Sequence, residues 1–377
     1  EISNKSRICD CEELKHKAIG VTCDATNKLI ARQGDIWIGN ISDCVIVHTP
    51  CPFDYCNTAQ VSFSLTDPDP QCALNRTGIL CGRCQDGLSL ALGSNNCIQC
   101  PQFSYLALII PFAAAGFGLV ALLMVLNLTV SIGTINGLIF YASIVKISES
   151  TGIFFPNGPI PVLSQFIAWL NLDLGIETCF YPGMTAYAKV WLQFVFPLYI
   201  WFIIATIIVL CRYSTWLSNK IGGNVVQVLA TLILLSFTKI FRTFAPALTW
   251  VTLSCKNLST TVWYVDGNVS YFSAMYYVLM AAAVLFLLLA VPYTLALLFD
   301  AVIEKIYLTR VYFRRQWIKF KPFVDAYHGP YKDNCRFWTG LLLLVRMTFT
   351  IVALHLSTSV VLIFITTSTC VLLSVML

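Results

Sequence analysis

The residues of this 377-residue chain that are best suited to chemistry are four closely spaced cysteines, Cys81, Cys84, Cys97 and Cys100. Their spacing, C-x2-C-x12-C-x2-C, would by itself fit four thiolates around one zinc ion. The surrounding segment also carries N-glycosylation sequons, which are used in the secretory pathway, where thiols oxidise. We therefore expect these cysteines in disulfide bonds, and the sequence predicts no metal ion or other cofactor.

These four belong to a larger concentration of cysteines at the start of the chain. Eleven of the 16 lie in residues 1–100, a segment with scattered charges and no long apolar run. Such density is typical of a small secreted domain that uses disulfides because its core is small. Residues 1–100 are therefore predicted to form a Cys-rich extracellular module. Because eleven is odd, at least one partner lies elsewhere or one thiol is free.

The elements that position these residues follow from an apolar composition. The chain is 57% apolar and 11% charged, and its mean hydropathy is +0.74. Because soluble domains contain roughly a quarter charged residues, residues 101–377 are expected to form a mainly α-helical, polytopic transmembrane bundle in a lipid bilayer. The net charge of +5 does not indicate nucleic acid binding, since the basic residues lie beside apolar segments and form no separate polar domain.

About seven apolar segments could cross the ~30 Å hydrocarbon core as helices. They lie near residues 105–126, 131–147, 191–211, 224–242, 274–299, 337–355 and 359–377. Segment 162–174 is apolar but too short to span, so it would lie flat at the surface or dip part-way into the membrane. Segment 243–253 is expected to be a kinked extension or a surface segment, with Pro246 as the break.

The basic segment Lys305–Arg336 sets the orientation, because it holds eight of the 24 Lys and Arg residues. Such residues collect in short cytoplasmic loops. The N-terminal module is therefore predicted outside the plasma membrane. Part of this segment also alternates with aromatic residues and could bind anionic lipid headgroups, through Arg314, Arg315, Lys319 and Lys321. Control of orientation explains the same residues, and we prefer that interpretation.

This orientation places two later cysteines, Cys179 and Cys255, in outer loops. A bridge between them would tie those loops together, as in many seven-helix receptors, and we expect it ahead of a pairing with the Cys-rich module. Five sequons are also expected outside, at Asn4, Asn40, Asn75, Asn257 and Asn268. A sixth, at Asn127, falls at an inner turn and should stay unmodified.

Charged residues inside the apolar segments are functional candidates. Lys239 and Arg242 are spaced i, i+3 towards the outer end of one span, and Arg346 lies near the middle of another. An ion at membrane depth usually has a partner or a water-filled path. Candidate partners for these cations, and for Lys189, are the outer acids Asp173, Glu177 and Asp266. For Arg346, a transport pathway is as good an explanation as a structural role, either in an ion pair or as a helix-end arginine that reaches to the interface. Two cations on one helix are too few for a voltage sensor.

No pattern in the sequence indicates catalysis. The four histidines, at positions 16, 48, 328 and 355, have no metal-ligand spacing and no paired catalytic partner. There is no phosphate-binding glycine loop, no HExxH and no GxSxG. We therefore expect a non-enzymatic protein.

Several segments of the membrane region carry a resemblance to a family. NLDLGIETCFYPGMTAYAKVWLQFVFPLYIW, NVVQVLATLILLSFTKIFRTF, WYVDGNVSYFS and KPFVDAYHGPYKDNCRFWTGLLLLVR resemble the membrane region of large polytopic proteins of sponges, cnidarians and related lineages. The resemblance implies a large ectodomain, often with upstream β-helical repeats, and further membrane sequence after Leu377, so we expect a fragment of a longer protein. In addition, CGRCQDGLSLALGSNNCIQC is similar to epidermal-growth-factor-like and ephrin-receptor-like modules.

Two function classes follow as expectations. The first is a cell-surface receptor or adhesion-type sensor that binds an extracellular ligand or protein. Cys211-Arg212-Tyr213 sits where G-protein-coupled receptors keep an Arg-Tyr pair, but the acid before that Arg and a seventh-span Asn-Pro motif are absent. The second is an ion channel or transporter, loosely similar to transient-receptor-potential-like proteins and favoured by Arg346, Lys146 and Lys189. The sequence indicates neither the ligand nor the ion nor the oligomeric state.

Overall fold

The structure is a computed structural model. It describes residues 21–23, 29–32, 36–39, 47–52, 54–57, 59–64, 67–102, 104–149, 167–168, 171–173, 178–221, 223–255, 258–300, 302–304, 311–329, 331 and 335–355. Everything below refers to these residues, and the predicted last span, 359–377, lies outside them.

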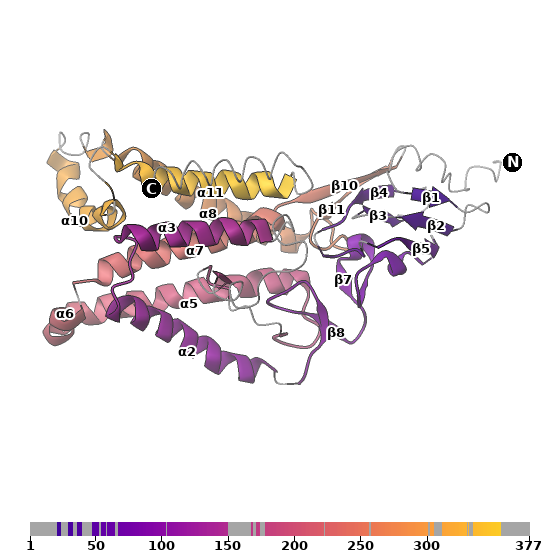
Figure 1. The fold of residues 1–377 in the computed structure, drawn as a ribbon, viewed down its shortest axis with the longest axis horizontal. Coiled ribbons are helices and arrows are strands. Elements are labelled where there is room, and N and C mark those ends of the chain that lie inside the picture. Colours follow the sequence, from indigo (N-terminus) through magenta and orange to yellow (C-terminus); the bar gives the residue numbers. More distant parts are fainter. Residues whose placement is uncertain are drawn as a thin grey trace. The chain divides into compact units, whose positions relative to one another are not determined.

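Short strands dominate the described part of residues 1–100, and long helices dominate the rest (Figure 1). The early strands are β1 (Val21–Cys23), β2 (Leu29–Arg32), β3 (Ile36–Gly39), β4 (Val47–Pro50), β5 (Val61–Ser64), β6 (Arg76–Thr77), β7 (Arg83–Cys84), β8 (Leu88–Leu90) and β9 (Cys97–Gln99), with 3-10 turns η2 (Asp69–Gln71) and η3 (Ile79–Cys81). The later elements are α2 (Ser104–Val125), α3 (Gly133–Glu149), α5 (Ala186–Tyr213), α6 (Thr215–Ile221), α7 (Val225–Ala247), β10 (Trp250–Cys255), β11 (Leu258–Trp263), α8 (Ala274–Leu298), α10 (Val311–His328) and α11 (Trp338–His355).

The chain divides into two compact units. The first, which we call the outer unit, contains residues 1–106, 176–191 and 246–281, and the second, the helical unit, contains residues 107–175, 192–245 and 282–377. The outer unit thus combines the predicted Cys-rich module with two segments that the sequence assigned to loops of the membrane domain. Four helices, α2, α5, α7 and α8, begin or end inside it.

The β10–β11 hairpin forms part of the core of the outer unit. Its strands pair antiparallel from Trp250 opposite Trp263 to Cys255 opposite Leu258. The inward side chains of Leu253 and Val262 are buried in one apolar cluster with residues of the N-terminal module, including Trp37. The segment that follows α7 is therefore not a free loop, because its hairpin shares a core with residues 37–81.

Glycines bring the turn after this hairpin against the backbone of the N-terminal module. Gly78 has a φ of +82°, and a Cβ there would lie 2.9 Å from the side-chain amide of Asn268. A Cβ on Gly82 would lie 2.8 Å from Cα of Asp266, and a Cβ on Gly267 would lie 2.7 Å from the carbonyl oxygen of Ile79. Such close approach requires glycine, so the two segments pack backbone against backbone.

The hairpin corrects the interpretation of segment 243–253. The sequence predicted a kinked extension or surface segment with a break at Pro246. Instead α7 continues through Pro246 to Ala247, and β10 begins at Trp250. Pro246 removes one backbone hydrogen bond from the last turn. That turn is held from outside the helix, because Trp263 Nε1 donates to the carbonyl oxygen of Ala247 at 2.7 Å.

Four disulfide bonds lie among the described residues, namely Cys51–Cys56, Cys72–Cys81, Cys84–Cys97 and Cys100–Cys179. The expected bridge between Cys179 and Cys255 is therefore wrong, because Cys179 is bonded to Cys100; the side chain of Cys255 lies outside the description. Of the four cysteines with zinc-like spacing, Cys84 and Cys97 are bonded to each other, whereas Cys81 and Cys100 are bonded to partners outside the quartet. Their sulfurs therefore do not converge on one metal position. The odd count of the module agrees with this pairing, since Cys179 is a partner from a later segment.

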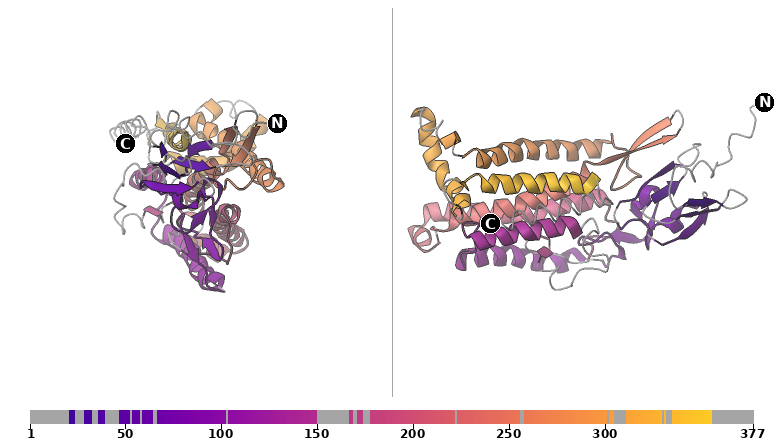
Figure 2. Two further views of the ribbon diagram at one scale, coloured as in Figure 1. Left: turned by 90° about the vertical axis from the view of Figure 1, so that its right-hand side faces the viewer. Right: turned by 45° about the horizontal axis from the view of Figure 1, so that its top comes forward.

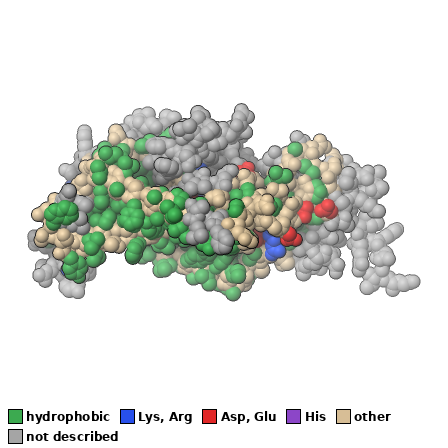
Figure 3. Space-filling view, turned by 90° about the horizontal axis from the view of Figure 1, so that it is seen from below, with side chains coloured by type: hydrophobic (Ala, Val, Ile, Leu, Met, Phe, Trp, Pro, Cys, Tyr) green, Lys and Arg blue, Asp and Glu red, His purple; other side chains and the backbone are tan. Residues whose placement is uncertain are grey.

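The helical unit is mostly helical and has four helices long and apolar enough to cross a membrane. They are Leu108–Val125, Ala186–Tyr213, Val225–Ala245 and Ala274–Leu298, and they correspond to four of the seven predicted spans. Two further predicted spans coincide with α3, which has 17 residues, and with α11, whose apolar part is the shorter Trp338–Ile351. Figure 3 shows apolar side chains spread over one face of the molecule. Exposed large side chains such as Ile110, Phe117 and Phe202 suit lipid as a surrounding solvent.

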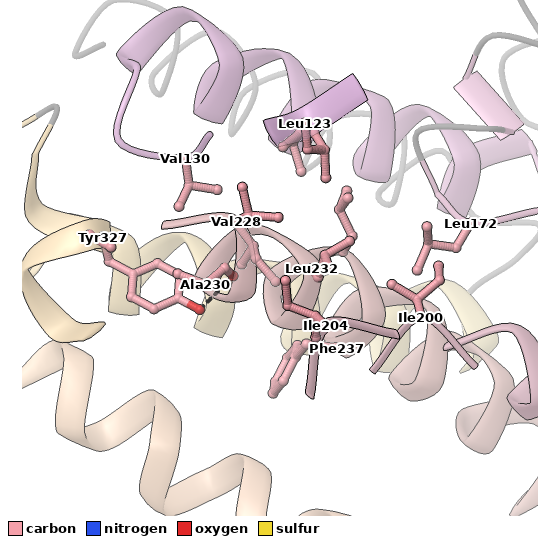
Figure 4. Close-up of a cluster of buried hydrophobic side chains, with 14 of the residues drawn as sticks. Leu123, Val130, Leu172, Ile200, Ile204, Val228, Ala230, Leu232, Phe237 and Tyr327 are labelled. Carbon is pink, nitrogen blue, oxygen red and sulfur yellow. Dashed lines mark hydrogen bonds between the residues drawn. The ribbon is translucent and has the colours of Figure 1, made fainter. Parts of the chain in front are cut away.

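Helix α7 is the central helix of the helical unit. In its span 72% of the residues are buried, against 17%, 33% and 22% for the spans of α2, α5 and α8. Figure 4 shows Val228, Leu232 and Phe237 of α7 among residues of other helices, including Ile204 of α5. The hydroxyl of Tyr327 donates to the carbonyl oxygen of Ala230 at 2.7 Å, which ties α10 to α7. Figure 2 shows α10 running steeply across the direction of α3 and α11.

The short apolar segment 162–174 lies largely outside the described residues. Its described part is buried within the helical unit, since Ile167, Ala168 and Leu172 are each at most 5% exposed. The side-chain amide of Asn171 donates to the carbonyl oxygen of Ala142 on α3 at 3.0 Å. This part of the segment therefore packs against helices, and Asp173 follows it directly.

Candidate functional site

The candidate site is a set of buried polar and charged side chains in the apolar interior of the helical unit. Helix α7 supplies Lys239 and Arg242, which its 3.6-residue period places on one face. Both cations bind the carboxylate of Asp173: the ammonium of Lys239 donates to one oxygen and Nη2 of Arg242 to the other. The sequence named Asp173 as one of three candidate partners, and the structure selects it.

The charges of this cluster stabilise one another, because Asp173 forms ion pairs with both Lys239 and Arg242. Burial raises the pKa of Asp173, but Arg242 and Lys239 lower it further, so its pKa lies well below the usual range and the group stays ionised. An unpaired ion at the centre of a membrane helix costs about 2.5–3.5 kcal/mol on insertion scales. Asp173 offsets that cost for the cations of α7. The cluster is therefore first of all structural, and only Nη1 of Arg242 within it is buried without a hydrogen-bond partner among the described residues.

Arg346 of α11 is in a different situation. Its side chain is 2% exposed, and its guanidinium lies 5.2 Å from the ring centroid of Phe140 on α3. Nη1 reaches the hydroxyl of Thr238 on α7 at 3.5 Å, which is a long hydrogen bond. Nε and Nη2 are buried. Among the described residues they have no hydrogen-bond partner, and no carboxylate there forms an ion pair with Arg346.

Polar groups continue from Arg346 along the α3–α11 contact. Asn136 of α3 is buried, and its amide donates to the hydroxyl of Tyr331 at 3.0 Å, while its own oxygen accepts no hydrogen bond in the described structure. Burial raises the pKa of Tyr331 to about 12, and the positive charge of Arg346 acts against that rise. Tyr331 is therefore a neutral phenol within electrostatic reach of the guanidinium.

A second charged cluster joins α10 to the segments before and after it. Glu304 accepts a hydrogen bond from Lys321 at 2.8 Å and one from Arg336 at 3.2 Å. The hydrogen bond from Lys321 lowers the pKa of Glu304. Lys321, one of the four predicted lipid-binding cations, is thus paired within the protein. The side chains of the other three, Arg314, Arg315 and Lys319, lie outside the description.

Next to this cluster, His328 and Asp300 form a buried pair that the sequence did not reveal. Nδ1 of His328 lies 3.5 Å from Oδ2 of Asp300, and both side chains are under 7% exposed. Burial lowers the pKa of His328 to about 4 and raises the pKa of Asp300. Each group is shifted towards its neutral form. Twenty-eight positions separate the two residues, which is why spacing alone gave no signal.

The remaining predicted site residues lie in the outer unit or outside the description. Nζ of Lys189 donates to the carbonyl oxygen of Ser94 at 2.5 Å and to Oδ1 of Asn95 at 3.2 Å, so these contacts lie within the outer unit. Oδ1 of Asp266 lies 4.0 Å from Nε of Arg83. Two of the five sequons predicted outside are described: the amide of Asn75 donates to the carbonyl oxygen of Cys97, and the amide of Asn268 donates to Oδ1 of Asp266. Those at Asn4, Asn40 and Asn257, and the acid Glu177, lie outside the described residues.

Comparisons with protein-family models, with functionally characterised proteins and with solved structures each return no match for this chain. Chemically, the helical unit offers one paired cluster of cations around Asp173 and one buried guanidinium with free donors. Both are consistent with a protein that holds or responds to charge inside an apolar helical interior.

We expect Asp173→Asn to destabilise the folded chain strongly. The substitution keeps the shape of the side chain but leaves Lys239 and Arg242 buried without a counter-charge. Removing one partner of a buried ion pair costs about 3–5 kcal/mol. Thermal unfolding of the detergent-solubilised full chain measures the effect.

The matched control for this prediction is Asp325→Asn, which neutralises an exposed carboxylate on α10. It should leave the unfolding temperature nearly unchanged. Because the folded-state pKa of Asp173 lies below its unfolded value of about 3.9, the stabilisation is present at neutral pH and is lost as the pH falls through the folded-state pKa. Equal stability of the two variants would show that Asp173 does not neutralise α7.

Proposed function

We propose that the chain is part of a non-enzymatic, multi-pass receptor or adhesion-type sensor of the plasma membrane, with its outer unit outside the cell. The observation that carries the proposal is the burial of the β10–β11 hairpin in the core of the Cys-rich module. An ectodomain that only tethered a ligand would need one flexible connection to the membrane helices. Here the module shares its core with a segment inserted between two of those helices.

The hairpin is bonded directly to the end of α7. The last carbonyls of a helix have no partner within the helix. That of Ala247 accepts from Trp263 of β11, and that of Leu248 accepts from the hydroxyls of Tyr271 and Tyr276 at 3.3 Å each. A change in the hairpin therefore changes the groups that hold the last turn of α7. This is a short physical route from the ectodomain to a membrane helix.

A second connection precedes α5. The disulfide Cys100–Cys179 fixes segment 178–185 to the module, and backbone hydrogen bonds join Leu90 to Met184 and Leu92 to Thr178. The start of α5 is held through Lys189. Two of the membrane helices, α5 and α7, thus have one end built into the same disulfide-bonded unit that would bind an extracellular ligand or protein.

The orientation rests on charge and redox chemistry. Disulfides form in the secretory pathway and persist outside the cell, whereas the basic segment 305–336 favours the cytoplasm. Anionic lipid at the inner face remains a candidate contact for Arg314, Arg315 and Lys319, with Lys321 already paired to Glu304. The oligomeric state does not enter the proposal.

We expect a change in the hairpin to alter the accessibility of residues on the opposite side of the membrane. Cys335 is an exposed cysteine beyond α10 without a disulfide bond, and its own modification, identified by peptide mapping, reports on that side. Leu253→Ala removes buried side-chain volume from the hairpin, at a cost of about 2–5 kcal/mol. The rate at which a maleimide modifies Cys335 in the membrane-embedded full chain should change several-fold.

The matched control is Thr252→Ala, because Thr252 lies on the exposed face of the same strand. It should leave the rate unchanged. Protease resistance of the helical unit checks that the Leu253 variant remains folded. Equal modification rates in the wild type and a folded Leu253→Ala variant would contradict transmission through the hairpin.

The second candidate function is an ion channel or transporter. It is favoured by the buried cations of the helical unit, above all by Arg346, whose donors are incompletely paired. Arginine and lysine inside apolar helices often line an ion or substrate path. Against a path through the α7 cluster stands Asp173, which pairs both cations there.

Whole-cell current recording on the full-length protein separates the two candidates. The sensor predicts no current of its own under voltage, stretch or an applied ligand. A current that Arg346→Ala abolishes, while the protein is still at the cell surface, would contradict the sensor function and support the channel function. Arg212→Ala, at an exposed arginine near the end of α5, is the control for charge loss.

A further inference from the structure

We propose that Arg346 binds one small monovalent anion, of the size and charge of chloride, in the interior of the helical unit. The proposed position lies where α3, α7 and α11 meet, marked by Phe140, Thr238 and Arg346. The inference holds for a sensor and for a channel alike, because it concerns a resident anion and requires no movement of it.

The first argument is charge. A guanidinium keeps its proton in proteins, so burial cannot neutralise Arg346 as it can neutralise a lysine or histidine. The other buried cation cluster of the helical unit contains a carboxylate, and the cluster around Lys321 and Arg336 contains Glu304. Within the described structure Arg346 has no such acid, and its side chain is 2% exposed. A single negative charge is what this position lacks.

The second argument is the arrangement of the donors. The two groups without a partner are Nε and Nη2. Their N–H bonds run parallel along one edge of the guanidinium plane, so both can point at the same acceptor. Nη1, on the other edge, reaches Thr238, and Phe140 lies beside the guanidinium. Thr238 and Phe140 thus hold Arg346, and the edge formed by Nε and Nη2 can donate two hydrogen bonds to one ligand.

The third argument is the size and charge of the ligand. Tyr331 lies within electrostatic reach of Arg346 but is a neutral phenol, so it does not balance the charge of the guanidinium. A second cation, which a divalent phosphate or sulfate would require, is not among the contacts of Arg346. The described contacts of the guanidinium are the ring of Phe140 and the hydroxyl of Thr238. A small singly charged anion therefore matches the donors and leaves no charge in excess.

The test is equilibrium dialysis of the detergent-solubilised full chain against radioactive chloride, with gluconate as the replacement anion. The wild type should bind one chloride per chain. Arg346→Met should abolish that binding, whereas Arg212→Met, at an exposed arginine of α5, should leave it unchanged. Arg346→Lys should weaken binding several-fold, because an ammonium keeps the charge but has no parallel pair of N–H groups.

Several results would overturn the proposal. One is a folded wild-type chain that binds no chloride. The same holds if a tightly bound phospholipid is found with its phosphate at Arg346 in place of chloride. Another is chloride binding that persists in Arg346→Met. If Arg346→Met does not fold, Arg346→Lys decides, and an affinity equal to that of the wild type would exclude the bidentate edge as the site. Thermal unfolding adds a second readout: chloride should raise the unfolding temperature of the wild type and not that of Arg346→Met.

Discussion

The helical unit depends on the neutralisation of charge along α7. This helix is the most buried of the four candidate spans and yet carries Lys239 and Arg242. It can occupy the centre because Asp173 accepts from both cations, and because Ala230 and Thr231 provide backbone and hydroxyl partners to neighbouring segments. The segment that carries Asp173 is itself buried through Leu172 and Asn171. Charge pairing therefore fixes a short connecting segment against the bundle as well as the helix.

The same helix links the interior of the bundle to the outer unit through the chain itself. Only Leu248 and Thr249 separate α7 from β10, and the carbonyls of Ala247 and Leu248 are bonded by residues of the outer unit. The hairpin in turn buries Leu253 and Val262 in the module core. A receptor or sensor built this way needs no separate linker between ligand-binding region and membrane helix. We prefer this arrangement to an ectodomain on a flexible tether because α7 leads directly into the hairpin.

Part of this structure could be predicted from the sequence, where the signal was local. The uncharged runs at 105–126 and 274–299 correspond closely to α2 and α8, because twenty or more apolar residues need no partner to define a span. Arg346 stood out as a charge in an apolar segment, and Asp173 was one of three outer acids that could pair with the cations. The hairpin was missed because its alternation in WVTLSC and LSTTVW is short, and its burial depends on residues about two hundred positions earlier. The partner of Cys179 was wrong for the same reason, since pairing depends on which segments share a core.

The central claim is that the Cys-rich module and the later outer segments form one folded unit. Peptide mapping of the full chain under non-reducing conditions tests it most directly, by identifying the partner of Cys179. The structure predicts a peptide that contains Cys100 joined to one that contains Cys179. A peptide that joins Cys179 to Cys255, or a free Cys179, would contradict the account and return the module to the role of an independent stalk.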